Sequence, residues 1–206
     1  PKGVHALLAG PEFRTQISWP QVHLFWGDER CVPPTHADSN YRMAEESLLR
    51  YVPIPAQNIH RIPAEQEPLQ AADAYEQTLR TAFALPAGAL PRFDLIFLGM
   101  GPDGHTASLF PGTVGLREDK RLVVAHSVEK LHTWRVTLTY PVLNHAAHVV
   151  FLVCGADKAA TLKAVRHGAF QPEQLPSQRI RPVDGTLHWL VDEAAASLLN
   201  AEEKNP

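Results

Sequence analysis

Phe93-Asp94-Leu95-Ile96-Phe97-Leu98 is a mostly apolar run that opens directly into Gly99-Met100-Gly101-Pro102-Asp103-Gly104-His105. A short, continuous apolar run of this kind is typical of a strand in the middle of a parallel sheet that is covered on both faces. The glycines that follow it allow a tight turn. The stretch therefore predicts a buried strand with a glycine-rich loop at its carboxyl end.

Strand and helix patterns alternate along the rest of the chain. Strands are predicted at 22–26, 122–124, 136–139, 148–153 and 187–191, and helices at 39–49, 70–83, 158–166 and 192–199. This alternation predicts an α/β fold, Rossmann-like and doubly wound, with a largely parallel sheet and helices on both faces. Residues 1–206 are expected to form a single domain, because the proline-rich stretch 51–68 is too short for an interdomain linker.

The composition limits the possible classes of function. The chain has 206 residues, of which 45% are hydrophobic, and this apolar content excludes intrinsic disorder. No apolar run approaches the roughly 18 residues of a membrane span. The net charge of −3, from 19 basic and 22 acidic residues, argues against nucleic acid as a partner. Cys31 and Cys154 form no CxxC motif, which favours a reducing, cytoplasmic location over a disulfide framework or a thiolate zinc site.

The start of the chain is unusual. It begins at Pro1 without an initiator methionine, and Pro1-Lys2-Gly3 is expected to lead into a helix with no strand before it. No signal peptide is recognisable at this end. We expect that an N-terminal strand is missing from the sequence.

Three loops are candidates for the functional site. In open α/β sheets, ligands bind beyond the carboxyl ends of the strands. Gly27-Asp28-Glu29-Arg30, Gly99 through His105, and Gly155-Ala156-Asp157-Lys158 are all expected at such positions. Each loop combines glycine with a carboxylate or a basic group, so we expect the three loops to surround one cleft.

His105 is the candidate reactive group of the middle loop. Imidazole can take a proton from water near neutral pH and return it to a leaving group. Asp103 could orient the ring, and Gly101 and Gly104 would allow a ligand to approach the backbone closely. The alternative is an ordinary loop histidine that binds backbone. The glycine spacing resembles a dinucleotide motif only superficially, because no crossover helix opens after it.

The charged residues of the other loops have two interpretations each. Arg30 could bind a phosphate or a developing oxyanion, with Asp28 and Glu29 holding its guanidinium and positioning His105. Asp28-Glu29-Arg30 could equally be a solvated turn with an internal ion pair. Lys158, predicted at the start of a helix, and Arg135, predicted at the start of a strand, could bind an anion or lie on the surface.

Several catalytic classes lack their motifs. His145 and His148 lie three residues apart, but no HExxH motif and no cluster that would supply a third ligand accompanies them, so no metal site is predicted. The sequence contains neither a GxSxG elbow nor a Walker A motif, which disfavours a serine esterase and a P-loop NTPase. No cofactor is expected.

Several long motifs together carry a resemblance to a known family. They are Gly27-Asp28-Glu29-Arg30-Cys31-Val32-Pro33, Asp38-Ser39-Asn40-Tyr41-Arg42-Met43, the segment 99–112, Arg135-Val136-Thr137-Leu138-Thr139, Gly155-Ala156-Asp157-Lys158-Ala159 and Trp189-Leu190-Val191-Asp192. In these stretches the sequence resembles the 6-phosphogluconolactonase family, and the likeness runs from Pro1 to about Leu199. The family normally begins with a strand and a Gly-Gly-Ser-Thr-Pro phosphate loop, and Pro1-Lys2-Gly3 resembles the tail of that loop.

The resemblance implies hydrolysis of 6-phosphoglucono-1,5-lactone, without a metal, in the oxidative pentose phosphate pathway. It implies that His105 is the general base and that Arg30, Arg135 and Lys158 bind the oxyanion or the phosphate. The expected partner is a phosphosugar lactone, with no nucleic acid and no membrane, and the expected state is a monomer or weak dimer. Two alternatives remain: a glucosamine-6-phosphate deaminase or isomerase on the same fold, and a catalytically silent phosphosugar-binding domain.

Overall fold

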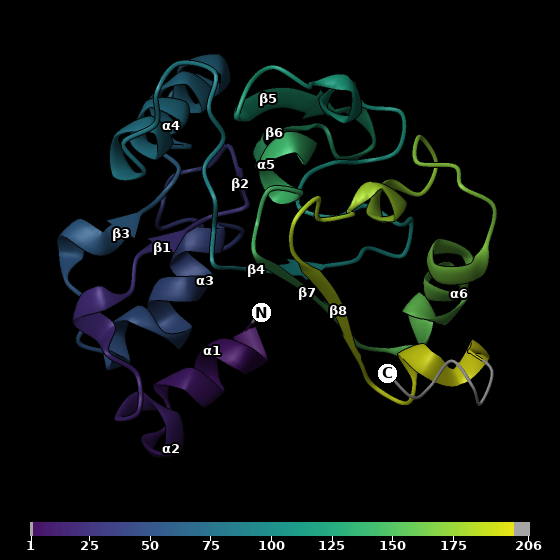
Figure 1. The fold of residues 1–206 in the computed structure, drawn as a ribbon, viewed down its shortest axis with the longest axis horizontal. Helices are drawn as coiled ribbons and strands as arrows, with labels where there is room; N and C mark the ends of the chain where they lie inside the picture. The colour runs from purple at the N-terminus through teal and green to yellow at the C-terminus, as the bar shows by residue number, and fades with distance from the viewer. Residues whose placement is uncertain (1, 200–206) are drawn as a thin grey trace.

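The strand predicted at 93–98 is β4, Leu95–Gly99, in the computed structural model, which describes residues 2–199. β4 pairs in parallel with β7 (His148–Val153), and β7 pairs in parallel with β8 (Thr186–Val191). These three strands lie near the centre of Figure 1 and form one sheet in the order β4-β7-β8. The apolar runs at 93–98, 148–153 and 187–191 therefore located this sheet correctly.

One face of the parallel sheet is open to solvent. Ile96 and Leu98 are buried, whereas Leu95 and Phe97, which point to the opposite face, are 47% and 42% exposed. Leu190 of β8, on the same face as Phe97, is also exposed. Within residues 2–199, β4 pairs with β7 alone. Apolar content predicts that a strand will be buried, but it does not show which elements cover it.

A second sheet is antiparallel. It consists of β2 (Asp28–Arg30), β6 (Thr133–Leu138) and β5 (Val123–Val128), in the order β2-β6-β5. Residues 28–30 were expected in a strand-exit loop, and they form a short strand instead. Their charged side chains have low strand propensity, so the sequence gives little indication of this strand. A separate parallel pair joins β1 (Leu24–Phe25) to β3 (Ile59–His60).

The helices are α1 (Lys2–Ala9), α2 (Pro11–Arg14), α3 (Asn40–Ser47), α4 (Pro68–Ala82), α5 (Tyr140–Leu143) and α6 (Ala159–His167). The α/β class is thus confirmed. Lys2 begins α1 as predicted, and Pro1 lies outside the described residues. The helix predicted after Asp192 is only a 3-10 turn, Ala195–Leu198. The carboxylate of Asp192 accepts hydrogen bonds from both Ala195 N and Gly155 N, and it therefore also holds the loop after β7.

Helix α4 shows how the sequence specifies a boundary and a buried face. The carboxylate of Glu67 accepts from Leu69 N and Gln70 N at the helix start, and Pro68 occupies the first helical position. Ala71, Tyr75 and Leu79 recur at the spacing of one helix face and are fully buried. The hydroxyl of Tyr75 accepts from the backbone N–H of Trp26 and donates to its carbonyl, both at 2.9 Å. This residue therefore ties the helix to the segment between β1 and β2.

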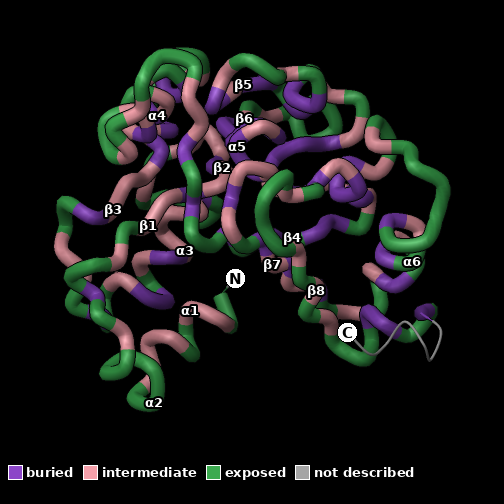
Figure 2. Tube along the Cα trace, viewed as in Figure 1, coloured by how far each residue is buried: buried purple, intermediate pink, exposed green. Residues whose placement is uncertain are grey.

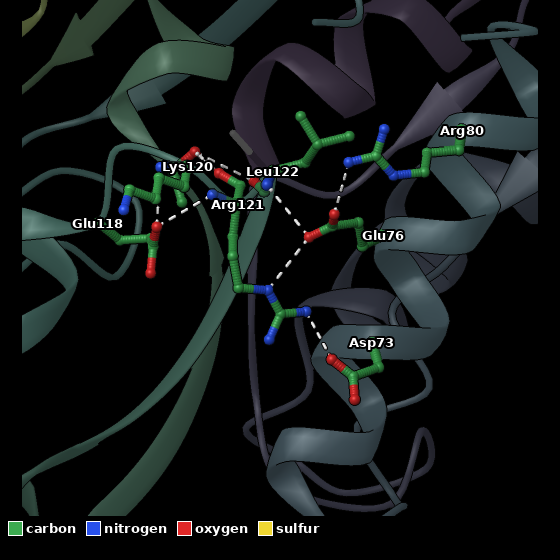
Figure 3. Close-up of polar contacts among 8 residues, drawn as sticks. Asp73, Glu76, Arg80, Glu118, Lys120, Arg121 and Leu122 are labelled. Atoms are coloured by element: carbon green, nitrogen blue, oxygen red, sulfur yellow. Dashed lines mark hydrogen bonds and ion pairs between the residues drawn. The ribbon is translucent and has the colours of Figure 1, made fainter. Parts of the chain in front are cut away.

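Ion pairs fix α4 to the start of β5, as Figure 3 shows. The guanidinium of Arg121 contacts Asp73 at 2.5 Å and Glu76 at 3.3 Å. Glu76 also accepts from Arg80 at 2.8 Å and from Leu122 N at 3.1 Å. Partial burial acts to raise the pKa of Glu76, but these hydrogen bonds outweigh it and lower the pKa. The network anchors the antiparallel sheet on the helix.

The core joins the two sheets. One cluster of buried apolar side chains includes Tyr75 of α4, Val123 of β5, Phe151 of β7 and Leu162 of α6. In Figure 2 the buried segments run through α4, β5 and β4 and reach α6. Within the described part of the chain, no helix is long and apolar enough to cross a membrane.

Candidate active site

A cavity of about 360 Å³ lies where the loop after β4 meets the antiparallel sheet. Its walls come from strand β2, from the loop 102–110 and from the β5–β6 hairpin. The lining residues are Asp28, Arg30, Pro102, Asp103, His105, Ala107, Ser108, Phe110, Lys130, Leu131 and Arg135. Two of the three predicted loop regions therefore meet in one place.

Two glycines shape the loop. A Cβ on Gly101 would overlap the ring of His105 and would lie 2.8 Å from Asp103 Oδ1, so only glycine lets the ring fold back over the loop. Gly104 has a φ of +77°, a conformation that favours glycine, and a Cβ there would lie 2.8 Å from Leu175 Cδ2. The predicted importance of these positions therefore has a steric basis in the loop itself.

His105 and Asp103 form a hydrogen-bonded pair. Nδ1 of His105 lies 2.5 Å from Oδ1 of Asp103, and the same oxygen accepts from the His105 backbone N–H at 3.2 Å. The imidazole stacks on Phe110, with 4.0 Å between the ring centroids. Within residues 2–199, Nε2 of His105 has no hydrogen-bond partner. With Nδ1–H donating to the carboxylate, Nε2 is the nitrogen that can accept a proton.

Asp103 also pairs with a lysine. Its Oδ2 pairs with the ammonium of Lys130, on the turn between β5 and β6. Partial burial acts to raise the pKa of Asp103, but the hydrogen bonds from His105 and Lys130 outweigh it and hold the pKa well below its usual range. Lys130 was not identified from the sequence, since it belongs to no local motif and lies 27 residues from Asp103.

Two arginines lie side by side at the cavity. Arg30 of β2 and Arg135 of β6 are direct cross-strand partners, and both line the cavity. Like charges at such positions repel. Burial and the charge of Arg30 lower the pKa of Arg135. Arg30 donates to the carbonyl of Asp38, and Arg135 donates to Thr133 Oγ1 at 3.2 Å. Neither guanidinium has a carboxylate partner among the described residues, so an anion bound here would relieve their repulsion.

Asp28 holds the loop against the sheet. Its Oδ2 accepts from the hydroxyl of Ser108 at 2.6 Å, and its Oδ1 accepts from Asn40 Nδ2 at 3.3 Å. Ser108 is buried and its carbonyl accepts from His126 Nε2. The sequence analysis did not select Ser108, because nothing in the chain around it indicates a partner 80 residues away.

The placement of Glu29 contradicts its predicted role at the cavity. Its side chain is buried and faces the start of α3, where the carboxylate accepts from Arg30 N, Asn40 N, Tyr41 N and Ser39 Oγ. Residues 28–30 form a strand, so successive side chains point to opposite faces. Asp28 and Arg30 therefore line the cavity, while Glu29 caps a helix and does not contact His105.

Lys158 directly precedes α6, as its N-cap residue, but does not line the cavity. Its ammonium pairs with Asp157, the residue before it. The hydroxyl of Thr161 on the same helix donates to the carbonyl of Pro102 at 2.6 Å, which attaches the start of α6 to the loop after β4. In this conformation, the third predicted loop supports the cavity wall without contributing a lining side chain.

The positions of the histidine and cysteine side chains bear on metal binding. His145 binds the carbonyl of Pro91, and His148 binds Thr186 Oγ1, so the two rings serve separate contacts. Over residues 2–199 there is no group of three or more histidine, cysteine, aspartate or glutamate side chains placed to hold a metal ion. Both cysteines are free thiols.

The fold is α/β, and one cavity brings the His105–Asp103 pair together with two adjacent arginines. Residues 1–189 match the family described as glucosamine-6-phosphate isomerases/6-phosphogluconolactonase. The chain belongs to this family.

Similar proteins agree with that assignment. A 6-phosphogluconolactonase of Synechocystis is 44% identical over 200 residues, which cover 97% of this chain and 80% of the relative. A 6-phosphogluconolactonase of Nostoc is 41% identical, with 97% of this chain and 81% of the relative covered. The solved structure of a 6-phosphogluconolactonase from Trypanosoma cruzi superposes with a TM-score of 0.84 at 30% identity and covers 97% of this chain and 81% of that one.

Proposed function

We propose that this protein hydrolyses 6-phospho-D-glucono-1,5-lactone to 6-phospho-D-gluconate, the lactonase step of the oxidative pentose phosphate pathway. The observation that carries the proposal is one cavity that holds both the His105–Asp103 pair and the adjacent guanidinium groups of Arg30 and Arg135. The 6-phosphogluconolactonases that are 44% and 41% identical over 97% of the chain support the same substrate.

His105 is the proposed general base. Its Nε2 takes a proton from a water molecule as the water oxygen bonds to the lactone carbonyl carbon. The tetrahedral intermediate then breaks the bond between this carbon and the ring oxygen, and the imidazolium returns the proton to the departing oxygen. Asp103, bound at Nδ1, keeps the ring oriented and stabilises its transient positive charge. A lactone is a reactive ester, so the reaction needs no nucleophilic serine.

Different basic side chains bind the oxyanion that develops in the reaction and the 6-phosphate of the substrate. Arg30 stabilises the developing oxyanion, and Arg135 holds the 6-phosphate together with Lys158. Anchoring the phosphate makes the attack of water effectively intramolecular. Asp28, through Ser108, holds the loop in place, and Gly101 and Gly104 allow the ring and the substrate to approach the backbone.

The remaining features of the proposal concern the whole molecule. We propose that residues 1–206 act as one domain, because a single cluster of buried side chains joins α4, both larger sheets and α6. We also propose a cytoplasmic monomer or weak dimer that acts without a cofactor. The two free thiols are consistent with a reducing compartment. Sedimentation velocity over a range of concentrations tests the oligomeric state.

The direct test is a lactonase assay on freshly prepared 6-phosphogluconolactone, with the spontaneous hydrolysis subtracted. We expect His105→Ala to lower kcat by about 10²–10⁴ with little change in KM. His148→Ala, on an exposed histidine of β7, is the matched control and should hydrolyse the lactone like the parent protein. Near-normal turnover by folded His105→Ala would exclude the general-base role, and no turnover by the parent protein would exclude the function.

A further inference from the structure

The turn between β5 and β6 carries a lysine into the cavity. Lys130 lies on the 3-10 turn Glu129–Leu131 and lines the cavity beside Asp103 and Phe110. Its ammonium pairs with Asp103 Oδ2 and lies 4.9 Å from the centre of the Phe110 ring. The imidazole of His105 stacks on that same ring. Lys130 and His105 therefore share two neighbours, the carboxylate and the phenyl ring.

The carboxylate of Asp103 connects the two basic groups. Oδ1 binds His105 Nδ1, while Oδ2 binds Lys130. The terminal torsion of an aspartate is soft, so one partner alone leaves the carboxylate plane free to turn. A second charged partner on the other oxygen holds that plane and keeps Oδ1 facing Nδ1. In this orientation the carboxylate selects the tautomer with a proton on Nδ1 and a bare Nε2.

The turn has a defined geometry for presenting this lysine. His132 ends the turn in the left-handed region, with φ 48° and ψ 41°, and its N–H donates to the Glu129 carbonyl. Histidine is one of the residues that tolerates this conformation. The reversal sends the chain back along β6 toward Arg135, so a single hairpin delivers both Lys130 and Arg135 to the cavity.

We propose that Lys130 is a positioning residue for lactone hydrolysis, one that holds Asp103 so that His105 keeps Nε2 free to accept the proton of water. The inference rests on the proposed function for its kinetic consequence. Direct contact between Lys130 and the anionic substrate is the competing role. If Lys130 acts through Asp103, the effect of a Lys130 substitution on kcat requires Asp103. If Lys130 binds the substrate directly, that effect does not require Asp103.

A double-mutant cycle separates these roles. Lys130→Met should lower kcat about tenfold with KM changed less than about threefold, and Lys130→Arg should restore most of the rate because it keeps the charge. In an Asp103→Asn background, Lys130→Met should lower kcat by less than about twofold, since its target is already lost. Lys163→Met, on an exposed lysine of α6, is the matched control. Equal effects of Lys130→Met in both backgrounds, or an effect confined to KM, would overturn the proposal.

A second measurement needs no substrate. Long-range ¹H–¹⁵N NMR distinguishes the two neutral tautomers of histidine, and the His105 signals are assigned from the spectrum of His105→Gln. We expect Nδ1-protonated His105 in the parent protein and a mixture of tautomers in Lys130→Met. An unchanged tautomer in Lys130→Met would refute the positioning role. This result stands whether or not the parent protein hydrolyses the lactone, so a failure of the function and a failure of this inference are distinguishable.

Discussion

The start of α3 and the loop after β4 each contain a carboxylate with several hydrogen bonds, yet the two carboxylates serve different purposes. Three of the four donors to Glu29 are backbone N–H groups, and its side chain is buried. Asp103 is bound by two basic side chains, those of His105 and Lys130, and by one backbone N–H, that of His105. A carboxylate held mainly by backbone stabilises a fold, whereas one held by side chains can influence chemistry.

The largest expected effect is on the stability of the Glu29 region. Glu29→Gln replaces one acceptor oxygen with a donor group that faces other donors, so we expect the free energy of unfolding to fall by about 2–3 kcal/mol. Urea denaturation monitored by circular dichroism measures this change. Any residual folded protein should keep a kcat within about threefold of the parent value. A stable Glu29→Gln protein with a large loss of kcat would contradict the assignment of Glu29 to the stability of the fold.

Asp103→Asn should show the opposite pattern. We expect kcat to fall roughly 10- to 100-fold, because the amide neither holds the imidazole tautomer nor stabilises the imidazolium. The free energy of unfolding should change by less than about 1 kcal/mol, since the side chain is partly exposed. Steady-state kinetics and urea denaturation on the same preparation test both expectations. A loss of stability as large as that of Glu29→Gln would show that Asp103, like Glu29, mainly stabilises the fold.

The dependence of stability on pH sharpens the contrast. The pKa of Asp103 lies below its usual value of 3.8 in the folded protein, so on acidification the unfolded chain binds this proton first. The stabilising contribution of Asp103 is therefore present above about pH 4 and is lost as the pH falls through the folded-state pKa. We expect the difference in unfolding free energy between the parent protein and Asp103→Asn to narrow as the pH falls below about 4. A difference that does not narrow on acidification would contradict this assignment.

The smallest expected effect concerns a third pair, Lys158 and Asp157. Lys158 lies outside the cavity in this conformation, so Lys158→Ala should raise KM only about threefold and leave kcat nearly unchanged. Initial rates over a range of lactone concentrations measure both constants. An unchanged KM would remove Lys158 from the proposed phosphate site and leave the arginine pair as its cationic part.

The sequence predicted those parts of the site that depend on local pattern. The apolar run at 93–98 and the three glycines after it located β4, the loop and His105. The class of fold followed from the alternation of strands and helices. The residue pattern left two interpretations for Arg30 and Arg135, and the resemblance to the family implied that they bind an anion. Their pairing depends on an antiparallel register that neither arginine reveals on its own.

Other parts depend on contacts between distant segments. Asp28 and Glu29 are adjacent in sequence. Because they lie in a strand, their side chains point to opposite faces, so that Asp28 faces the cavity and Glu29 faces α3. Lys130 and Ser108 find their carboxylate partners 27 and 80 residues away. Such contacts are set by the packing of the hairpin and the loop, which no short-range pattern encodes.

In a sheet, a neighbouring strand pairs with the backbone N–H and C=O groups along an edge. At Trp26, the hydroxyl of Tyr75 pairs with both groups. By donating a hydrogen bond to the carbonyl of Trp26 and accepting one from its N–H, it satisfies both backbone groups at the place where the chain leaves β1 and turns into β2. The chain therefore changes from a parallel to an antiparallel partner while both backbone groups of Trp26 stay paired. Trp26 lies just before β2, so these two hydrogen bonds from α4 fix the chain at the entrance to the strand that carries Asp28 and Arg30 to the cavity.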